Sequence, residues 1–192
     1  MIKVLVASNN KGKIAEIKEI FKDFNILSLK ELGIDIDINE DANTFAENAQ
    51  KKAEAILEYV DKDTYVLADD SGLCIDVLNG FPGVNTRRWK EGTDRERNLE
   101  LIKLLDGKEN RKCHFITSIA VANRDNTFVV NESIDGEIST LPKGDNGFGF
   151  DEIFLLDNSR TLAELSMEEK NKISARKKAL EKAKNYILSL HK

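Results

Sequence analysis

The chain has 192 residues and 41% of them are hydrophobic, which suits one domain with a core of its own. Its formal net charge is −5 at pH 7, so the protein as a whole has no basic field of the kind that attracts nucleic acid. No apolar run approaches the ~20 residues of a membrane span, the N-terminus lacks a signal-peptide layout, and Cys74 and Cys113 lack metal-ligand spacing. We therefore expect a soluble cytoplasmic protein with reduced thiols that binds neither nucleic acid nor membrane.

The chain opens with an apolar stretch, residues 2–7, that predicts a strand buried on both faces. A polar segment follows, and apolar residues then recur at helical spacing from Ile14 to Phe21. The segment therefore joins a strand to a helix N-terminus, where free N–H groups and the helix dipole favour an anion such as phosphate. A solvated loop is the alternative. The segment consists of Ser8, Asn9, Asn10, Lys11, Gly12 and Lys13.

Residues 26–29 predict a second strand, and alternating isoleucines predict a half-exposed strand over residues 34–39. Thr44 and Glu47 have the spacing of a capping box, which starts a helix whose apolar face continues to about residue 60. Glu40 lies just before this helix. An acidic side chain there either serves the helix dipole or reaches a metal ion, and the pattern alone leaves both interpretations open.

The stretch that we expect to organise the site lies in the middle of the chain. Residues 64–68 predict a short buried strand, which Asp69 and Asp70 follow directly. Ser71 and Gly72 come next, and polar residues with a glycine after a strand indicate a chain reversal where open α/β sheets bind ligands. If both aspartates kept strand geometry, they would project to opposite faces, so at most one would point into a pocket. An ordinary turn is the alternative.

Residues 79–84 form a glycine and proline loop that could border a ligand. A second capping box opens a helix over residues 93–105, which Gly107 is expected to end. Residues 113–122 and 127–138 predict two long strands of an antiparallel hairpin.

Glycines and two aromatic residues occur together in residues 144–151, where the backbone can approach a ligand closely and the rings can stack on a planar base. Residues 150–156 also read as a strand, in which case Phe148 and Phe150 are ordinary core residues. Both interpretations stay open. A capping box at Ser166 predicts one final helix, reaching residue 190.

These motifs occur together in one family. On this ordered set the chain resembles the inosine triphosphate pyrophosphatase-like nucleoside triphosphate pyrophosphatases over nearly its whole length. The matching motifs are Ser8-x-Asn10-x-x-Lys13-x-x-Glu16, Thr44-Phe45-x-Glu47-Asn48-Ala49, Asp69-Asp70-Ser71-Gly72-Leu73, Pro82-Gly83-Val84, Phe148-Gly149-Phe150-Asp151 and Glu169-Lys170.

The resemblance implies an elongated α/β fold around a long mixed β-sheet. It also implies a single pyrophosphatase domain over residues 1–192, with two lobes and an active-site cleft between them, and a homodimer. The implied reaction is the Mg²⁺-dependent hydrolysis of the nonstandard purine nucleotides ITP, dITP and XTP to the nucleoside monophosphate and pyrophosphate, which removes them from the nucleotide pool.

The resemblance also assigns roles to residues. Glu40 and Asp70 would hold Mg²⁺, and Asp70 and Asp69 would be the catalytic carboxylates that orient or deprotonate the attacking water. The implied substrate-binding residues are Ser8, Asn9, Asn10, Lys11, Gly12, Lys13, Ser71, Phe148, Gly149, Phe150, Asp151, Lys170 and Arg176.

Two positions depart from the family pattern: Ala175 stands where a histidine is usual, and Phe150 where Tyr or Trp is common. We therefore expect that Ala175→His raises kcat/KM for ITP by supplying a missing hydrogen bond to the base. The alternative is that neighbouring residues already compensate and the imidazole crowds the pocket. Two other hypotheses are a Maf-type nucleotide pyrophosphatase and a catalytically silent nucleotide-binding protein. The Ser-x-x-Arg-Arg-like opening of the first is absent, and the retained Lys13, Glu40 and aspartate pair argue against the second.

Overall fold

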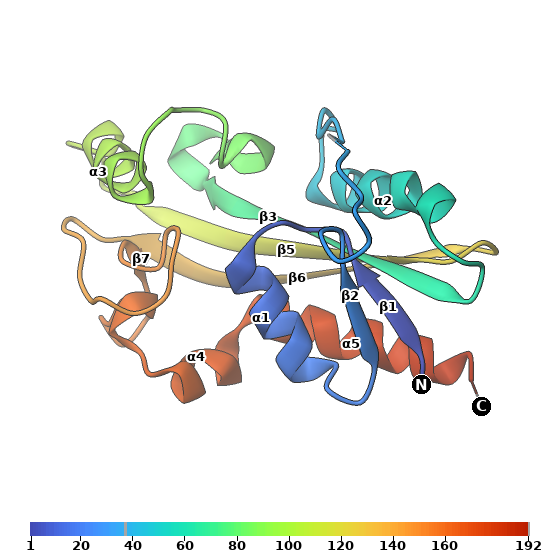
Figure 1. Ribbon diagram of the computed structural model, residues 1–192. Helices are drawn as coiled ribbons and strands as arrows, with labels where there is room; N and C mark the ends of the chain where they lie inside the picture. The colour runs from blue at the N-terminus through green and yellow to red at the C-terminus, as the bar shows by residue number, and fades with distance from the viewer. Residues whose placement is uncertain (37, 192) are drawn as a thin grey trace. The chain divides into compact units, whose positions relative to one another are not determined.

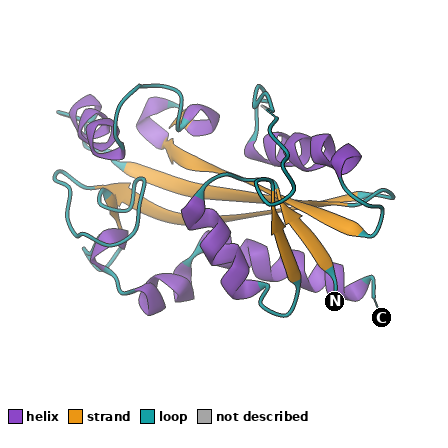
Figure 2. Ribbon diagram, in the orientation of Figure 1, coloured by secondary structure: helices purple, strands orange, loops and turns teal. Residues whose placement is uncertain are grey.

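The computed structural model describes residues 1–36 and 38–191 (Figure 1). The chain has the predicted mixed α/β fold, in which helices are combined with a mixed β-sheet (Figure 2). Within the described residues the sheet has seven strands in the order β2-β1-β3-β5-β6-β7, and β4 pairs with β3 off this path. Two compact units make up the chain: Met1–Ser71, Thr117–Glu132 and Arg176–Lys192 form the first, and Gly72–Ile116 and Ser133–Ala175 the second.

The first unit is built on parallel strands. β1 (Lys3–Val6) pairs in parallel with β2 (Asn25–Ser28) on one side and with β3 (Thr64–Ile75) on the other. Leu5 therefore lies beside Val66, and alternate residues of each strand point to opposite faces. Both faces carry apolar side chains, which matches the strand predicted to be buried on two sides.

Helices cover both faces of these strands (Figure 1). α1 (Lys11–Ile20) and α5 (Ala175–Ser189) pack on one face, and α2 (Phe45–Ile56) packs on the other. The predicted capping box at Thr44 and Glu47 starts α2. The core under α1 and α5 includes Val4, Val6, Ile17, Phe21, Leu67, Ile119, Leu180 and Ile187. The core under α2 includes Leu5, Ala49, Ala53, Ile56, Val66 and Ala68.

The predicted chain reversal at the two aspartates is wrong. β3 continues through Asp69 and Asp70 to Ile75, and the chain turns only after it, where Asn79 takes a left-handed φ of 54°. The carboxylates do not end the strand because charged side chains from other elements pair with them. A buried strand can carry polar residues when they have such partners.

The strand predicted over residues 34–39 is also wrong. No described residue of that segment belongs to a strand, and Asp37 lies outside the described residues. Ile34, Ile36 and Ile38 instead pack against the cluster beneath α2. The alternation of apolar residues there is satisfied by contact with a helix and needs no partner strand.

β5 (Lys112–Ala122) and β6 (Thr127–Ile138) form the predicted hairpin. The Asn123 N–H donates to the Asn126 carbonyl at its turn, and the Ile138 N–H donates to the Arg111 carbonyl at its far end. These two pairings make the strands antiparallel.

The second unit adds short strands and two helices. β4 (Phe81–Pro82) pairs antiparallel with the end of β3, and β7 (Phe154–Leu155) does so with the end of β6. α3 (Asp94–Leu104) starts at the predicted capping box of Thr93. The core of the second unit includes Leu73, Ile75, Leu101, Leu105, Ile138, Phe150, Ile153, Phe154 and Leu162.

Two predictions for the later chain need correction. Only Phe154–Leu155 of the strand expected over residues 150–156 is a strand, because the preceding residues form turns. The final helix is interrupted at Ser174, whose ψ of 120° separates α4 (Met167–Ile173) from α5. Neither glycine nor proline marks this break in the sequence. No helix within the described residues has the length and apolar character needed to cross a membrane.

Candidate functional site

The polar segment between β1 and α1 caps its own helix. Asn10 is the N-cap residue, and its side-chain oxygen accepts hydrogen bonds from the Gly12 N–H at 2.9 Å and the Lys13 N–H at 3.2 Å. The Asn10 N–H in turn donates to the Ser8 hydroxyl at 3.2 Å. Asn9 and Lys11 are exposed. The predicted joint of strand and helix is confirmed, and its first turn contains no acidic residue that would repel an anion.

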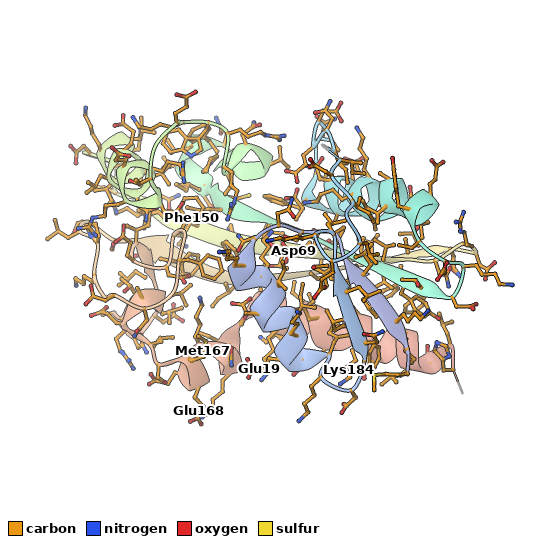
Figure 3. All side chains as sticks on the ribbon, viewed as in Figure 1. Glu19, Asp69, Phe150, Met167, Glu168 and Lys184 are labelled. Atoms are coloured by element: carbon orange, nitrogen blue, oxygen red, sulfur yellow. The ribbon has the colours of Figure 1, made fainter. Side chains whose placement is uncertain are left out.

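Asp69, which is labelled in Figure 3, lies at the centre of a buried ion network. Its Oδ1 accepts hydrogen bonds from Lys13 Nζ and, at 2.9 Å, from the Ser71 hydroxyl, and its Oδ2 accepts one from Arg176 Nε at 2.9 Å. Burial alone would raise the pKa of Asp69, but the charges of Lys13 and Arg176 outweigh it and hold that pKa well below its usual range. Asp69 is therefore a permanent negative charge that anchors two cations.

Arg176 extends this network. Its side chain is only 7% exposed, and its guanidinium also donates to Glu16 Oε2 at 3.0 Å. The pKa of Arg176 is raised because the attraction of Asp69 and Glu16 exceeds the effect of burial, which by itself would lower it. Arg176, which the resemblance assigns to substrate binding, thus pairs with two carboxylates of the first unit.

Asp70 has a different environment on the opposite side of β3. Lys52 Nζ, from α2, lies 2.8 Å from Glu40 Oε1, 2.7 Å from the Asp69 carbonyl oxygen and 3.7 Å from Asp70 Oδ1. Asp70 Oδ2 is buried and has no hydrogen-bond partner among the described residues. The Asn48 amide lies close enough to lower the pKa of Asp70, but it lacks hydrogen-bond geometry.

The balance of these effects favours the neutral form of the Asp70 carboxyl. Burial raises the pKa of Asp70 and Glu40 adds to the rise, whereas the charge of Lys52 opposes it. The two adjacent aspartates therefore shift in opposite directions, Asp69 downward and Asp70 upward. Carboxyls whose environments separate their pKa values in this way commonly have different roles, and an unsatisfied buried oxygen calls for a ligand.

Glu40 and Asp70 offer the donor chemistry that suits a hard cation. Both supply carboxylate oxygens, both contact the ammonium of Lys52, and Asp70 keeps one oxygen unpartnered in the described chain. No cluster of three or more His, Cys, Asp or Glu side chains suited to a metal ion occurs within residues 1–36 and 38–191. Mg²⁺ needs no such cage, because it keeps several waters and binds through one or two carboxylates together with substrate phosphates. These residues fit an ion of that kind.

The aromatic-glycine segment belongs to the second unit. Asp151 Oδ2 accepts hydrogen bonds from the Phe148 N–H at 2.9 Å and from Lys170 Nζ at 2.6 Å. Lys170 Nζ also lies 5.1 Å from the centre of the Phe148 ring. A cavity of about 400 Å³ adjoins this segment, and its lining includes Asp94, Arg95, Asn146, Phe148, Gly149 and Asp151.

The two aromatic rings differ in exposure. Phe148 is 38% exposed, whereas Phe150 is 8% exposed and packs in the core of the second unit. Of the two readings of this segment, the ligand-facing one therefore suits Phe148 and the core one suits Phe150.

The sequence prediction missed Lys52, which contacts both proposed metal ligands. A signal was present: Lys52 falls on the buried face of α2, next to Ala53 and in the same helical period as Ala49 and Ile56. A lysine on an apolar helix face is buried only when it has a carboxylate or carbonyl partner. Glu40 supplies that partner, whereas the sequence prediction considers Glu40 only for the helix dipole or for a metal ion.

A model of the Ham1 family matches residues 4–186. The chain belongs to the Ham1 family. A dITP/XTP pyrophosphatase from Thermoanaerobacter pseudethanolicus is 46% identical to it over 194 residues, with 97% of both chains covered. A dITP/XTP pyrophosphatase from Clostridium perfringens is 43% identical over 204 residues, with 100% of both chains covered.

Solved structures agree with this assignment. The Ham1 protein of Staphylococcus aureus matches with a TM-score of 0.89 at 36% identity, over 97% of this chain and 98% of that chain. The recognised family and fold class are thereby confirmed, and the individual site residues stay predictions.

Proposed function

We propose that this Ham1 chain hydrolyses dITP, XTP and ITP to the nucleoside monophosphate and pyrophosphate. Its similarity to dITP/XTP pyrophosphatases over nearly the full length of both chains supports this reaction. The observation that carries it is the contrast within one dipeptide. Asp69 is a charged anchor for two buried cations, and Asp70 is a buried carboxyl with an unpartnered oxygen beside a second acidic residue, within the described chain.

The cations of the first unit suit a triphosphate. Lys13 and Lys52 are both largely buried, and a buried ammonium interacts more strongly with phosphate than an exposed one. Ser8, Asn10 and Gly12 surround the start of α1, where the helix dipole favours negative charge. We assign this segment, residues 8–13, together with Ser71 to phosphate binding.

Glu40 and Asp70 would hold Mg²⁺, which neutralises phosphate charge and polarises the scissile bond when it is bound. Asp70 would orient the attacking water and take its proton at a carboxylate oxygen, and its buried Oδ2, which has no hydrogen-bond partner in the described chain, is placed for that role. Asp69 keeps Lys13 and Arg176 in place and does not exchange a proton near neutral pH. Of the catalytic roles expected for Asp69, we therefore propose only the positioning of Lys13 and Arg176.

Base selection is assigned to the second unit. The Phe148 ring can stack on a planar base, and Lys170 can donate to the 6-oxo group of hypoxanthine or xanthine. Adenine carries an amino donor at that position, so the same lysine would face a donor. Sites that hydrogen-bond one group discriminate strongly against an analogue that lacks it.

A panel of nucleoside triphosphates with purified protein and Mg²⁺ tests the proposal. Pyrophosphate release from dITP, XTP and ITP, whose bases carry a 6-oxo group, should exceed that from ATP by roughly tenfold or more. Chelation of the metal ion is the control and should abolish release. Equal rates on ATP and dITP would contradict the base assignment, and no turnover on any nucleotide would favour a catalytically silent nucleotide-binding protein.

We also propose a homodimer and a cytoplasmic location, the first from family resemblance and the second from the nucleotide pool on which the reaction acts. Two free cysteines, Cys74 and Cys113, agree with a reducing compartment. Light scattering tests the dimer: a mass near the 21.6 kDa of one chain at micromolar concentration would contradict it.

A further inference from the structure

Two side chains of α3 form hydrogen bonds with the backbone of one glycine, Gly149. Asp94 Oδ2 accepts a hydrogen bond from the Gly149 N–H at 3.1 Å, and Asn98 Nδ2 donates to the Gly149 carbonyl at 2.8 Å. Asp94 and Asn98 are four residues apart, so they share one face of the helix. Both polar groups of Gly149, which lies between the two aromatic residues, are therefore held by α3.

Asn98 holds a second point of the same segment. Its Nδ2 also donates to Glu152 Oε1 at 2.8 Å, so one amide spans residues 149 and 152. The side chain is buried, and its Oδ1 has no hydrogen-bond partner among the described residues. A buried oxygen without a partner destabilises the fold, and an apolar residue would avoid it. Asn98 thus leaves one oxygen unsatisfied, while its amide nitrogen makes two bonds to the segment that an apolar residue could not make.

The segment that α3 holds, residues 145–153, has no helix or strand of its own. Residues 145–153 form bends and turns, and Gly149 takes a left-handed φ of 65°. Side-chain bonds therefore add to its few backbone bonds in fixing the direction of the Phe148 ring and of the Asp151 carboxylate. Asp94 and both of these side chains line the cavity of about 400 Å³.

We propose that Asp94 and Asn98 are positioning residues for base selection, which act through Gly149 to fix the orientation of Phe148 and Asp151. This inference rests on the proposed function of the segment. Neither residue needs to touch the nucleotide. Loss of either side chain would let the segment adopt other conformations. Binding of the base would then have to supply the free energy that orders the segment, whereas phosphate binding and hydrolysis would not change.

Steady-state kinetics on dITP and dATP with four variants test the proposal. In Asp94→Ala and Asn98→Ala we expect the ratio of kcat/KM for dITP to that for dATP to fall at least roughly tenfold, through a higher KM for dITP with kcat nearly unchanged. Asp94→Asn retains an acceptor for the Gly149 N–H and should recover most of the selectivity. Leu99→Ala changes an exposed side chain of the same helix and should match the wild type.

Two further readouts separate positioning from general damage and from failure of the proposed function. Inhibition by inorganic tripolyphosphate, which has no base, should be equal in all variants. Amide hydrogen exchange of residues 144–152 in the free protein should accelerate in Asp94→Ala but not in Leu99→Ala, whether or not the protein hydrolyses dITP.

Unchanged selectivity in a folded Asp94→Ala variant would overturn the inference, and so would equal loss of dITP turnover in Asp94→Ala and Asp94→Asn. If Asn98→Ala does not fold, the comparison of Asp94→Ala with Asp94→Asn still tests the inference. Absence of dITP hydrolysis in the wild type would instead refute the proposed function. The exchange data would still show whether the α3 side chains order residues 144–152.

Discussion

Replacing Asp69 with asparagine keeps the shape of the side chain and removes the charge that Lys13 and Arg176 share. Both cations are nearly buried, with side chains 12% and 7% exposed, and Asp69 itself is 0% exposed. Removal of one partner from a buried ion pair destabilises a protein by about 3–5 kcal/mol. Burial already lowers the pKa of Lys13, so the variant can release that proton, and this places the expected loss near the lower end, about 3 kcal/mol.

The loss converts into a fall in melting temperature of about 6–12 °C for a chain of this length. Circular dichroism melts at pH 7 measure it, with Asp70→Asn as the matched control. The folded state raises the pKa of Asp70 above its unfolded value, so the ionised carboxyl is less stable in the fold, and its contribution to stability declines as pH rises. Removing that charge should leave the melting temperature unchanged or higher, while pyrophosphate release collapses.

The pair of variants therefore separates the two aspartates. Lys52 retains Glu40 and the Asp69 carbonyl oxygen in Asp70→Asn, so no buried cation loses all its partners. If Asp69→Asn melted within 2 °C of the wild type, the ion network would not be the anchor described above. Full turnover of Asp70→Asn at saturating Mg²⁺ would show that Asp70 is neither base nor metal ligand.

Three other substitutions have defined outcomes. Lys52→Met should lower kcat/KM for dITP at least roughly tenfold, because it removes the ammonium beside both proposed metal ligands; wild-type kinetics would contradict that role. The pKa of His114 is raised, chiefly by its hydrogen bond to Asp135, so His114→Gln should lower the melting temperature below about pH 6 and have no effect near pH 9; an equal effect at both pH values would refute the ion pair. Ala175 is 2% exposed, so Ala175→His should overpack the core by about 1–3 kcal/mol and not give the expected gain on ITP; a higher kcat/KM with unchanged melting would contradict this.

Features governed by local rules could be predicted from the sequence. The capping boxes at Thr44 and Thr93 start helices as expected, because a cap depends on residues three positions apart. The hairpin of residues 113–138 formed as expected for a similar reason, since its turn joins strands that are adjacent in the chain.

Features that depend on distant residues could not. The strand continues through Asp69 because Lys13 and Arg176 pair with its carboxylate. These partners lie 56 and 107 residues away in sequence, so the strand could not be predicted from nearby residues. A short window sees only two acids, a serine and a glycine, which favour a turn. The break at Ser174 was hidden for another reason: the charged residues on both sides have similar helix propensity.

Product analysis tests the central claim most directly. The protein is incubated with dITP and Mg²⁺, and the phosphorus-containing products are identified by ³¹P NMR and chromatography, with Asp70→Asn as the inactive control. The account predicts dIMP and pyrophosphate in equal amounts from the wild type. Formation of dIDP and orthophosphate would place cleavage at the β–γ bond and contradict it.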